Sequence, residues 1–352
     1  MLLRRMLQTV PVIGLCTVLF AGTAQAAEPS IPVADRDAAT ALVGMYDSDT
    51  GLWPSTGWWN AANDVTAIAD YGLATDSHQY DSLFANTFDK NKNNNFTNSY
   101  IDDTGWWGLA WVRAYDLTHQ RRYLDIATKD ADYMYSYWDD TCGGGVWWST
   151  AKTYKNAIPN ELFLKLTAEL HNRIPHDTKY LGESQQEWKW FQASGMINSD
   201  HLINDGLDST TCKNNNGTTW TYNQGVILGG LVDLHQATGD PALLRSAQQI
   251  ADAATSSNFL NPNGILTEPC EANNGCGGDG PSFKGIFVRN LGELNGPLHQ
   301  RYRTYLVKQA KSAIANDRNA QNQYGLHWAG PFDKADGARQ HSALDLLTAA
   351  RG

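Results

Sequence analysis

Two adjacent carboxylates, Asp102 and Asp103, stand directly before a Thr-Gly-Trp-Trp sequence. Carboxyl groups supply the acid, base or nucleophile of glycoside hydrolysis, and indole rings stack on the apolar faces of pyranose rings. Aspartate is also favoured at the N-cap and in the first turn of a helix, and capping is the ordinary explanation of such a pair. The rest of the chain therefore decides between a capped helix and a sugar-cleaving site.

The composition supplies more aromatic rings than a core requires, with 13 Trp and 15 Tyr among 352 residues. We expect several of them to face a ligand. Trp58 and Trp59 follow a glycine that allows a tight backbone turn, and together with Asn60 they could contact a sugar or serve as core and helix cap. Trp106 and Trp107 are separated by about 100° on a helix, so we expect only one of them to face a cleft.

Helical periodicity recurs along the chain, and strand-like alternation does not. An N-cap followed by proline at Asp240–Pro241 marks one helix start, and short joints at 118–120 and 238–240 imply antiparallel neighbours. Twelve helices make six hairpins, which predicts an all-α chain folded as an (α/α)6 barrel. The predicted helices span 35–47, 59–75, 78–90, 103–118, 121–137, 156–174, 177–195, 223–238, 241–256, 283–294, 299–318 and 337–350.

Loops rich in Gly, Trp and Asn alternate with short, plain junctions. The rich loops lie at 56–60, 104–107 and 143–149 and form a degenerate internal repeat. This alternation predicts that one end of a helical toroid carries the elaborate loops and the other carries the tight turns. We therefore expect ligand binding at the elaborate end.

The first 26 residues have the pattern of a signal peptide. Two arginines precede an apolar run at 10–21, and a small-x-small cleavage motif ends at Ala26. The run is too short to span a bilayer. We expect residues 1–26 to be removed and the rest of the chain to be exported, to an extracellular or periplasmic location. Since no linker divides residues 27–352, we expect them to form one domain.

The charge of the chain argues against several partners. The formal net charge is −10, and it becomes −12 when the two arginines of the first 26 residues are removed. Nucleic acid and anionic surfaces both favour a basic patch, so neither is expected as a partner. No other apolar run is long enough to span a membrane, and we expect a monomer that does not bind one.

Four cysteines follow the predicted signal peptide, and an even number in an exported chain indicates two disulfides. Cys270 and Cys276 enclose a short loop, which favours a local bridge and leaves Cys142 to pair with Cys212. Zinc is the alternative, but no Cys-x-x-Cys motif or His pair at ligand spacing accompanies these cysteines. We expect neither a metal nor a cofactor.

Five blocks of sequence, in order, resemble glycoside hydrolase family 76, the endo-α-1,6-mannanases and their fungal cell-wall relatives. The resemblance runs from about residue 58 to the end of the chain, and the agreement of five separate blocks makes it specific. The blocks are IDDTGWWGLAW at 101–111, GGVWWS at 144–149, YKNAIPNELF at 154–163, TYNQG at 221–225 and FKGIFVR at 283–289.

The resemblance implies an (α/α)6 barrel and a retaining mechanism with Asp102 as nucleophile and Asp103 as acid/base. The spacing of the two acids does not decide the stereochemistry. Retaining enzymes hold their carboxyls about 5–5.5 Å apart and inverting enzymes about 6.5–9.5 Å, and adjacent residues of a helix can reach either separation. The chemistry requires one charged and one protonated acid, and their coupling predicts that they titrate as a unit.

The resemblance also favours recognition of sugar hydroxyls by Tyr154, Lys155 and Asn156, whose alternative role is a solvated helix start. Tyr222, Asn223 and Gln224 open a predicted helix and could equally cap it or form the wall of the cleft. Lys284 and Arg289 are expected in structural ion pairs rather than in catalysis.

The leading hypothesis is a secreted, retaining endo-α-1,6-mannanase that acts on an α-mannan or mannosylated glycan, because an open groove lined by indoles suits a polymer. One alternative is an α-mannan transglycosidase of the cell-wall remodelling type. The other is a non-catalytic glycan-binding protein on the same scaffold, which the presence of both acids disfavours.

Overall fold

The computed structural model describes residues 28–273 and 275–351, so the predicted signal peptide at 1–26 lies outside the described residues. The described part of the chain is helical, with only isolated β-bridges between its loops. Its twelve α-helices are α1 (Ile31–Val43), α2 (Trp58–Thr75), α3 (Asp81–Asn91), α4 (Ile101–Thr118), α5 (Arg121–Tyr135), α6 (Ala157–Arg173), α7 (Lys179–Ser194), α8 (Thr221–Thr238), α9 (Pro241–Ser256), α10 (Phe283–Asn295), α11 (Arg303–Asn316) and α12 (Gly337–Arg351).

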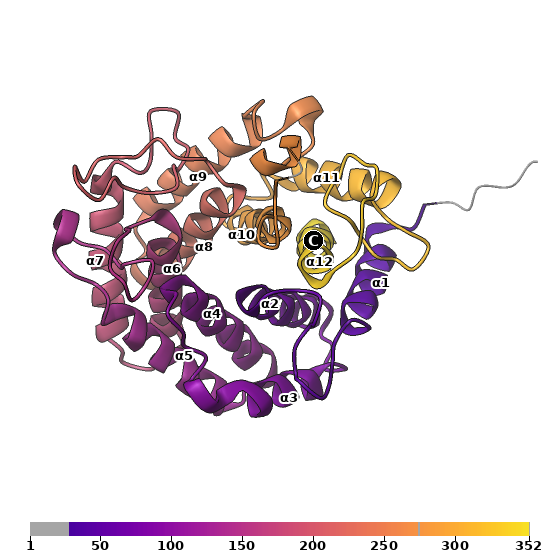
Figure 1. Cartoon of the computed structure of the whole chain (residues 1–352), viewed down its shortest axis with the longest axis horizontal. Coiled ribbons are helices and arrows are strands. Elements are labelled where there is room, and N and C mark those ends of the chain that lie inside the picture. Colours follow the sequence, from indigo (N-terminus) through magenta and orange to yellow (C-terminus); the bar gives the residue numbers. More distant parts are fainter. Residues whose placement is uncertain (1–27, 274, 352) are drawn as a thin grey trace, which may run out of the picture.

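The even-numbered helices form a closed inner ring in which each packs on the next, and α12 returns to pack on α2. The odd-numbered helices lie outside this ring (Figure 1). This arrangement confirms the predicted (α/α)6 barrel. The largest differences from the predicted bounds are at α1 and α11, which begin four residues before and four residues after their predicted starts.

Burial explains which helices form the inner ring. The outer helices α5 and α9 bury one face and expose the other, as amphipathic surface helices do. The inner helix α6 buries every residue from Ala157 to Leu170. Close packing also needs small side chains, since a Cβ on Gly225 of α8 would lie 2.5 Å from the Cα of Phe287 in α10.

The long loops all precede inner helices. They span 44–57, 136–156, 195–220, 257–282 and 317–336, with a shorter one at 92–100. The connections that leave the inner helices are shorter, such as the two residues between α4 and α5 and between α8 and α9. The amino ends of the six inner helices therefore meet at the end of the barrel that carries the elaborate loops.

Two disulfides hold loops at this end. Cys142–Cys212 joins the loop before α6 to the loop before α8, and Cys270–Cys276 closes a short turn in the loop before α10. Both predicted pairings are confirmed. Each bond adds a covalent restraint to an irregular segment of the loop end.

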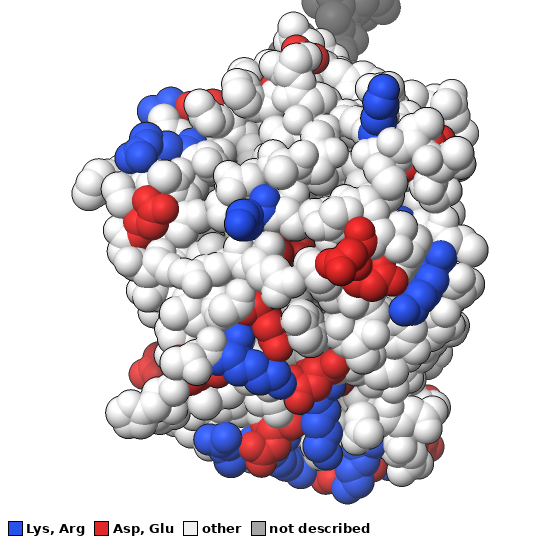
Figure 2. Space-filling view, turned by 90° about the vertical axis from the view of Figure 1, so that its left-hand side faces the viewer, with Lys and Arg blue, Asp and Glu red and all other residues white. Residues whose placement is uncertain are grey.

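The side of the barrel that carries α7 shows acidic and basic side chains intermixed on its described surface, without one continuous patch of either sign (Figure 2). Within residues 28–351, apart from the undescribed position 274, no helix has the length and hydropathy needed to cross a membrane.

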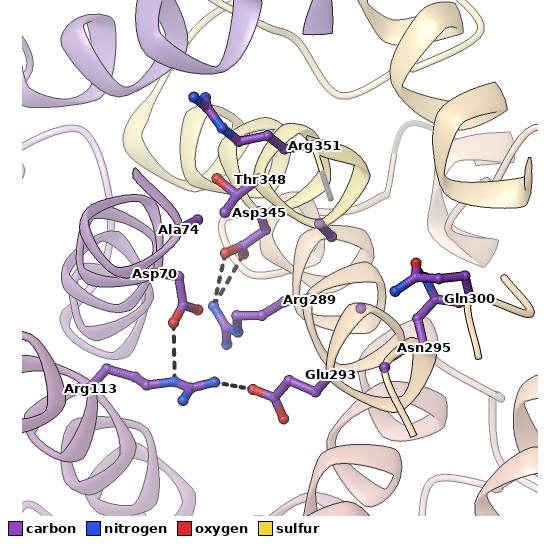
Figure 3. Close-up of a pocket in the computed structure, with 13 residues that line it drawn as sticks. Asp70, Ala74, Arg113, Arg289, Glu293, Asn295, Gln300, Asp345, Thr348 and Arg351 are labelled. Carbon is purple, nitrogen blue, oxygen red and sulfur yellow. Dashed lines mark hydrogen bonds and ion pairs between the residues drawn. The ribbon is translucent and has the colours of Figure 1, made fainter. Parts of the chain in front are cut away.

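A cavity of about 600 Å³ opens at the opposite end of the barrel, where the inner helices finish (Figure 3). Charged side chains line it, and each arginine among them has a carboxylate partner. Arg113 pairs with Asp70 at 3.1 Å, and Arg289 pairs with Asp345 at 3.1 Å. Because these cations are already neutralised, we assign the cavity a structural role rather than a ligand.

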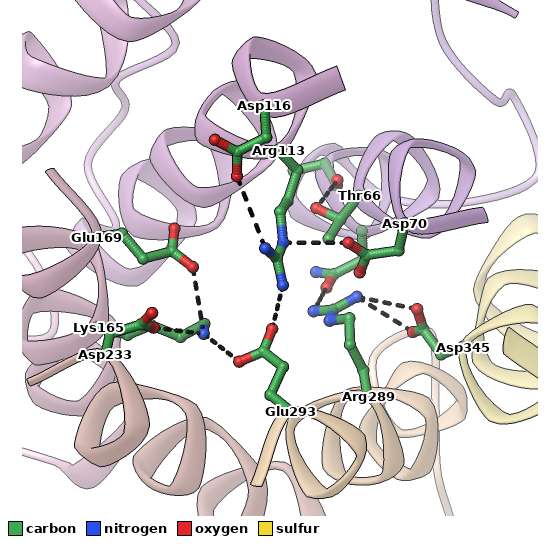
Figure 4. Close-up of polar contacts among 12 residues, drawn as sticks. Thr66, Asp70, Arg113, Asp116, Lys165, Glu169, Asp233, Arg289, Glu293 and Asp345 are labelled. Carbon is green, nitrogen blue, oxygen red and sulfur yellow. Dashed lines mark hydrogen bonds and ion pairs between the residues drawn. The ribbon is translucent and has the colours of Figure 1, made fainter. Parts of the chain in front are cut away.

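The pair of Arg113 and Asp70 belongs to a larger network of ion pairs among the inner helices (Figure 4). Lys165 of α6 lies 3.0 Å from Asp233 of α8 and 2.6 Å from Glu293 of α10, and Glu293 also binds Arg113 of α4. Buried charges are tolerated only when they are paired in this way. Lys284 pairs with Glu271 at 2.6 Å, so both of the cations that were expected in structural ion pairs form them.

The buried carboxyls predict how stability depends on pH. Burial raises the pKa values of Glu187, Glu268 and Asp317 to about 8. In the unfolded chain these groups lose their protons near pH 4–4.5. Between those values the folded state binds more protons, so the free energy of unfolding should fall as pH rises from about 5 to 8. Thermal unfolding followed by circular dichroism measures this slope.

Glu187→Gln removes one of these protons and keeps an acceptor for the Trp138 indole, which donates to Glu187 at 3.2 Å. The slope should therefore become shallower in this variant. Asp200→Asn, at an exposed position, is the control and should leave the slope unchanged. A melting temperature that rises over this pH range in the wild-type protein would contradict the prediction.

Candidate active site

A pocket of about 250 Å³ lies at the end of the barrel where the inner helices begin. Its lining combines carboxylates with aromatic rings and includes no Lys or Arg among the described residues. Such a surface suits a neutral ligand with apolar faces and hydroxyl groups. The lining residues are Trp59, Asp102, Trp106, Trp148, Tyr154, Asn156, Asp205, Tyr222, Asp279 and Phe283.

Asp102 and Asp103 occupy the first turn of α4, whose first residue is Ile101. The loop before α6 fixes this turn, because the amide of Ile101 donates to the carbonyl of Trp148 at 2.8 Å. The Trp148 indole Nε1 donates to Oδ2 of Asp102 at 3.1 Å. Asp103 points elsewhere, and its Oδ2 accepts a 2.6 Å hydrogen bond from Nδ2 of Asn98.

The two acids present themselves differently to the pocket. Asp102 lines it, and the Oδ1 atom of Asp102 is buried without a hydrogen-bond partner among the described residues. Asp103 is half-buried and is not among the described residues that line the pocket. One oxygen of Asp102 is therefore held by an indole, and the other makes no hydrogen bond within the described structure.

Burial raises the pKa of both acids. The pKa of Asp102 rises to about 8, first through burial and then through the charge of Asp103, against the stabilising hydrogen bond from Trp148. The pKa of Asp103 rises to about 6, mainly through burial; Asn98 lowers it and the charge of Asp279 raises it. Near neutral pH the pair therefore holds about one proton, which is the state that acid-assisted glycoside cleavage requires.

An aromatic wall forms one side of the pocket. Trp59 of α2 stacks on Trp106 of α4 with ring centroids 5.5 Å apart. Tyr222 of α8 stacks on Phe283 of α10 at 4.0 Å, and Trp106 lies 6.4 Å from Tyr222. Four inner helices thus contribute rings to one continuous surface, on which a pyranose ring could stack.

Hydrogen-bonding groups form the other side. The Tyr154 hydroxyl donates to Oδ2 of Asp205, and Nδ2 of Asn215 donates to the same hydroxyl at 2.9 Å. Asn156 lines the pocket with its side-chain carbonyl oxygen buried and unpartnered within the described structure. This side offers acceptors that match sugar hydroxyls.

Several of the candidate residues lie outside the pocket. Trp107 is fully buried and packs on Trp58, with ring centroids 4.7 Å apart, so of the Trp106 and Trp107 pair only Trp106 borders the pocket. Asn60 is buried and donates to Oγ of Ser282 at 2.8 Å. These side chains hold the start of α2 rather than a ligand.

Lys155, Asn223 and Gln224 are also buried away from the pocket surface. The Lys155 ammonium donates to Oδ1 of Asp139 at 3.0 Å and to the Gly144 carbonyl at 2.6 Å, so it supports the loop before α6. The Gln224 amide bonds the backbone N–H and carbonyl of residue 203 at 2.7 and 2.8 Å. Asn223 is fully buried, with its side-chain amide unpartnered among the described residues.

Four lining residues did not appear among the sequence candidates. Trp148 and Phe283 belong to two of the quoted blocks, and the Gly-Gly-Val-Trp-Trp loop was a usable signal for Trp148. Asp205 and Asp279 are single acids in long irregular loops, where no motif or periodicity distinguishes them from solvated acids.

The sequence model for glycosyl hydrolase family 76 matches residues 30–351. The chain belongs to this family. It is 28% identical to the mannan endo-1,6-alpha-mannosidase DFG5 of Candida albicans, over 86% of this chain and 74% of that protein, and 28% identical to DFG5 of Saccharomyces cerevisiae, over 86% and 72%. The fold is similar to that of an alpha-1,6-mannanase of Salegentibacter, with a TM-score of 0.82 and 23% sequence identity. The match covers 91% of this chain and 99% of that one. The Salegentibacter protein in that structure is an inactive variant in complex with alpha-1,6-mannotriose.

Membership of family 76 supports a glycosidase, and it agrees with a pocket that is lined by Asp102 of the acid pair and by stacked aromatic rings. The hydrogen bond from Trp148 is the contact most specific to that pair. An indole N–H stabilises the charged form of a carboxylate and lowers its pKa.

Replacing Trp148 by Phe should therefore raise the pKa of Asp102 further, because the donor to the charged form is lost. Carbon-detected NMR titration of the aspartate carboxyls measures this change. Trp147→Phe is the matched control, since the Trp147 indole donates to Asp139 at 2.7 Å instead. If both variants titrate like the wild-type protein, Trp148 does not stabilise the Asp102 carboxylate.

Proposed function

We propose that this protein is a secreted endo-α-1,6-mannanase that hydrolyses the backbone of α-1,6-mannan with retention of anomeric configuration. The observation that carries the proposal is the consecutive pair Asp102–Asp103, which shares about one proton beside an aromatic-walled pocket. The pocket lies at the loop end of the barrel, where the inner helices begin.

The comparisons support this choice of substrate. The curated relatives bear the name mannan endo-1,6-alpha-mannosidase, and the Salegentibacter enzyme binds alpha-1,6-mannotriose in a variant made inactive by replacing two consecutive aspartates with asparagine. Asp102 and Asp103 are the consecutive aspartates beside the pocket in this chain. The carboxylate-rich lining also favours a neutral glycan such as mannan over a phosphorylated or uronic one.

We assign Asp102 as the nucleophile and Asp103 as the acid/base. Asp102 lines the pocket, and its Oδ1 has no hydrogen-bond partner among the described residues, so we assign to this carboxylate the attack on the anomeric carbon. Before substrate binds, Asp102 has the higher pKa of the pair. The positive charge that develops at the anomeric carbon favours the ionised form of Asp102, so that the shared proton belongs on Asp103 during cleavage.

The reaction then proceeds in two balanced steps. Asp103 gives its proton to the glycosidic oxygen as that bond breaks, and Asp102 forms an ester with the anomeric carbon. Asp103, now charged, accepts a proton from the water that attacks the same carbon and releases Asp102. Each displacement inverts the carbon once, and two inversions give net retention.

Export of the protein is part of the proposal. Residues 1–26 would direct secretion and be removed, leaving 27–352 as one catalytic domain that works as a monomer. The two disulfides support an oxidising compartment, where such bonds form and persist. Among the residues that line the pocket, we assign Trp59, Trp106, Tyr154, Asn156 and Tyr222 to substrate binding.

Asp102→Asn and Asp103→Asn should each reduce oligosaccharide release from linear α-1,6-mannan at least about a hundredfold, because each removes one half of the acid pair. Reducing-end release measures activity, and circular dichroism verifies the fold. Asp200→Asn, an exposed change at the same end of the barrel, is the matched control and should keep full activity. Wild-type activity in either active-site variant would refute the assignment.

The anomer of the fresh product, followed by NMR, separates retention from inversion. Adding an acceptor oligosaccharide separates hydrolysis from transfer, since longer products would favour the transglycosidase alternative. Binding without any turnover across linear and branched α-mannans would instead favour a glycan-binding protein.

A further inference from the structure

One carboxylate of the pocket holds an aromatic ring of the same pocket in place. The indole Nε1 of Trp59 donates to Oδ1 of Asp279 at 2.8 Å. Trp59 lies in the first turn of α2, whereas Asp279 lies in the loop before α10, 220 residues further along the chain. In the inner ring, α12 lies between α2 and α10. The hydrogen bond therefore connects the start of α2 to the loop that precedes a helix two places away in the ring.

Covalent and packing contacts fix the backbone on both sides of Asp279. Before Asp279 in the sequence, the Cys270–Cys276 disulfide closes a turn. Directly after Asp279, the amide of Gly280 donates back to the Cys276 carbonyl at 2.9 Å. A Cβ on Gly280 would lie 2.8 Å from Sγ of Cys270, so the loop packs directly on the disulfide. Further along the chain, Oγ of Ser282 accepts a 2.8 Å hydrogen bond from Asn60 of α2.

The ring that Asp279 holds is a wall of the pocket. Trp59 is half-buried, stacks on Trp106 at 5.5 Å with an interplanar angle of 29°, and lies 6.1 Å from Phe283. An indole has a single N–H donor. Once Asp279 accepts that bond, the ring keeps one orientation within the wall of the pocket that it lines.

We propose that Asp279 is a positioning residue that, from the loop closed by Cys270–Cys276, fixes the Trp59 indole as a stacking platform for one sugar ring of the substrate. This inference rests on the proposed function for its substrate, the α-1,6-mannan chain. The hydrogen bond and the loop geometry on which it depends stand independently of the substrate.

The same carboxylate acts on the catalytic pair. Its negative charge raises the pKa of Asp103, after the larger effects of burial, which raises it, and the Asn98 hydrogen bond, which lowers it. Asp102, on the same helix, is a further titratable group beside Asp103, and from α5 the Tyr133 hydroxyl donates to the backbone carbonyl of Asn98. Removing the charge at position 279 should therefore lower the pKa of Asp103.

Two substitutions separate the two effects. Asp279→Asn keeps an acceptor oxygen for the indole and loses the charge. It should leave KM for α-1,6-mannan oligosaccharides within about twofold and move the pH profile of kcat/KM towards acid. Asp279→Ala loses both the acceptor oxygen and the charge. It should give the same acid shift of the pH profile. It should also raise KM roughly three- to tenfold and change kcat little. Asp200→Asn is the charge-matched control, with neither effect expected.

A readout without substrate keeps this test apart from the proposed function. In protein labelled with ¹⁵N-tryptophan, the Nε1–H resonance of Trp59, assigned by its loss in Trp59→Phe, should move and broaden in Asp279→Ala and stay near its wild-type position in Asp279→Asn. A wild-type protein that does not cleave α-1,6-mannan would refute the proposed function, while this resonance would still test the contact.

Two results would overturn the positioning role itself. The first is an unchanged Trp59 resonance in Asp279→Ala, which would mean that the carboxylate does not hold the ring. The second is a displaced resonance with an unchanged KM in an active enzyme, which would mean that the held ring is not a platform for the sugar.

Discussion

Two carboxyls on consecutive residues of one helix turn, both withdrawn from water, cannot both ionise at low cost. That constraint on Asp102 and Asp103 governs the loop end of the barrel. Their pKa values are raised to about 8 and 6, and each acid has one hydrogen-bond donor, Trp148 or Asn98, brought by a different loop. The barrel meets the constraint by collecting the amino ends of six inner helices at one end, where long loops can supply these donors.

One buried acid in the opposite half of the barrel shows the reverse shift of its pKa. Glu293 is buried like Asp102, yet its pKa is lowered to about 2, because the ammonium of Lys165 and the guanidinium of Arg113 outweigh burial. The described lining of the pocket includes neither Lys nor Arg. Glu293 is thus fixed as a charge in ion pairs that hold the helices together, whereas Asp102 and Asp103 have no cation partner among the described residues. The opposite pKa shifts come from the partners of these groups, because both Glu293 and Asp102 are buried carboxyls.

The helices could be predicted because burial follows the 3.6-residue period, and the pairing of the acids could be recognised because they are adjacent in sequence. The predicted start of α1 at residue 35 is wrong, because Pro32 lies in the first turn of the helix and is itself a signal for an earlier start. Lys155 had the chemistry of a sugar ligand, but its burial against backbone carbonyls depends on loop geometry that sequence does not display. Asp205 and Asp279 contact pocket residues that are distant in the sequence: Asp205 binds Tyr154, 51 residues away, and Asp279 binds Trp59, 220 residues away.

Those long-range contacts explain where the disulfides lie. Long loops lose much conformational entropy on ordering, and a site built on them needs restraints beyond hydrogen bonds. Cys142–Cys212 joins the loop that carries Trp148 and Tyr154 to the loop that carries Asp205, and Cys270–Cys276 braces the loop that carries Asp279. Each covalent link thus stands beside residues that contact the acid pair or the aromatic wall. Because these links persist only in an oxidising compartment, the geometry of the pocket and the proposed export of the chain depend on each other.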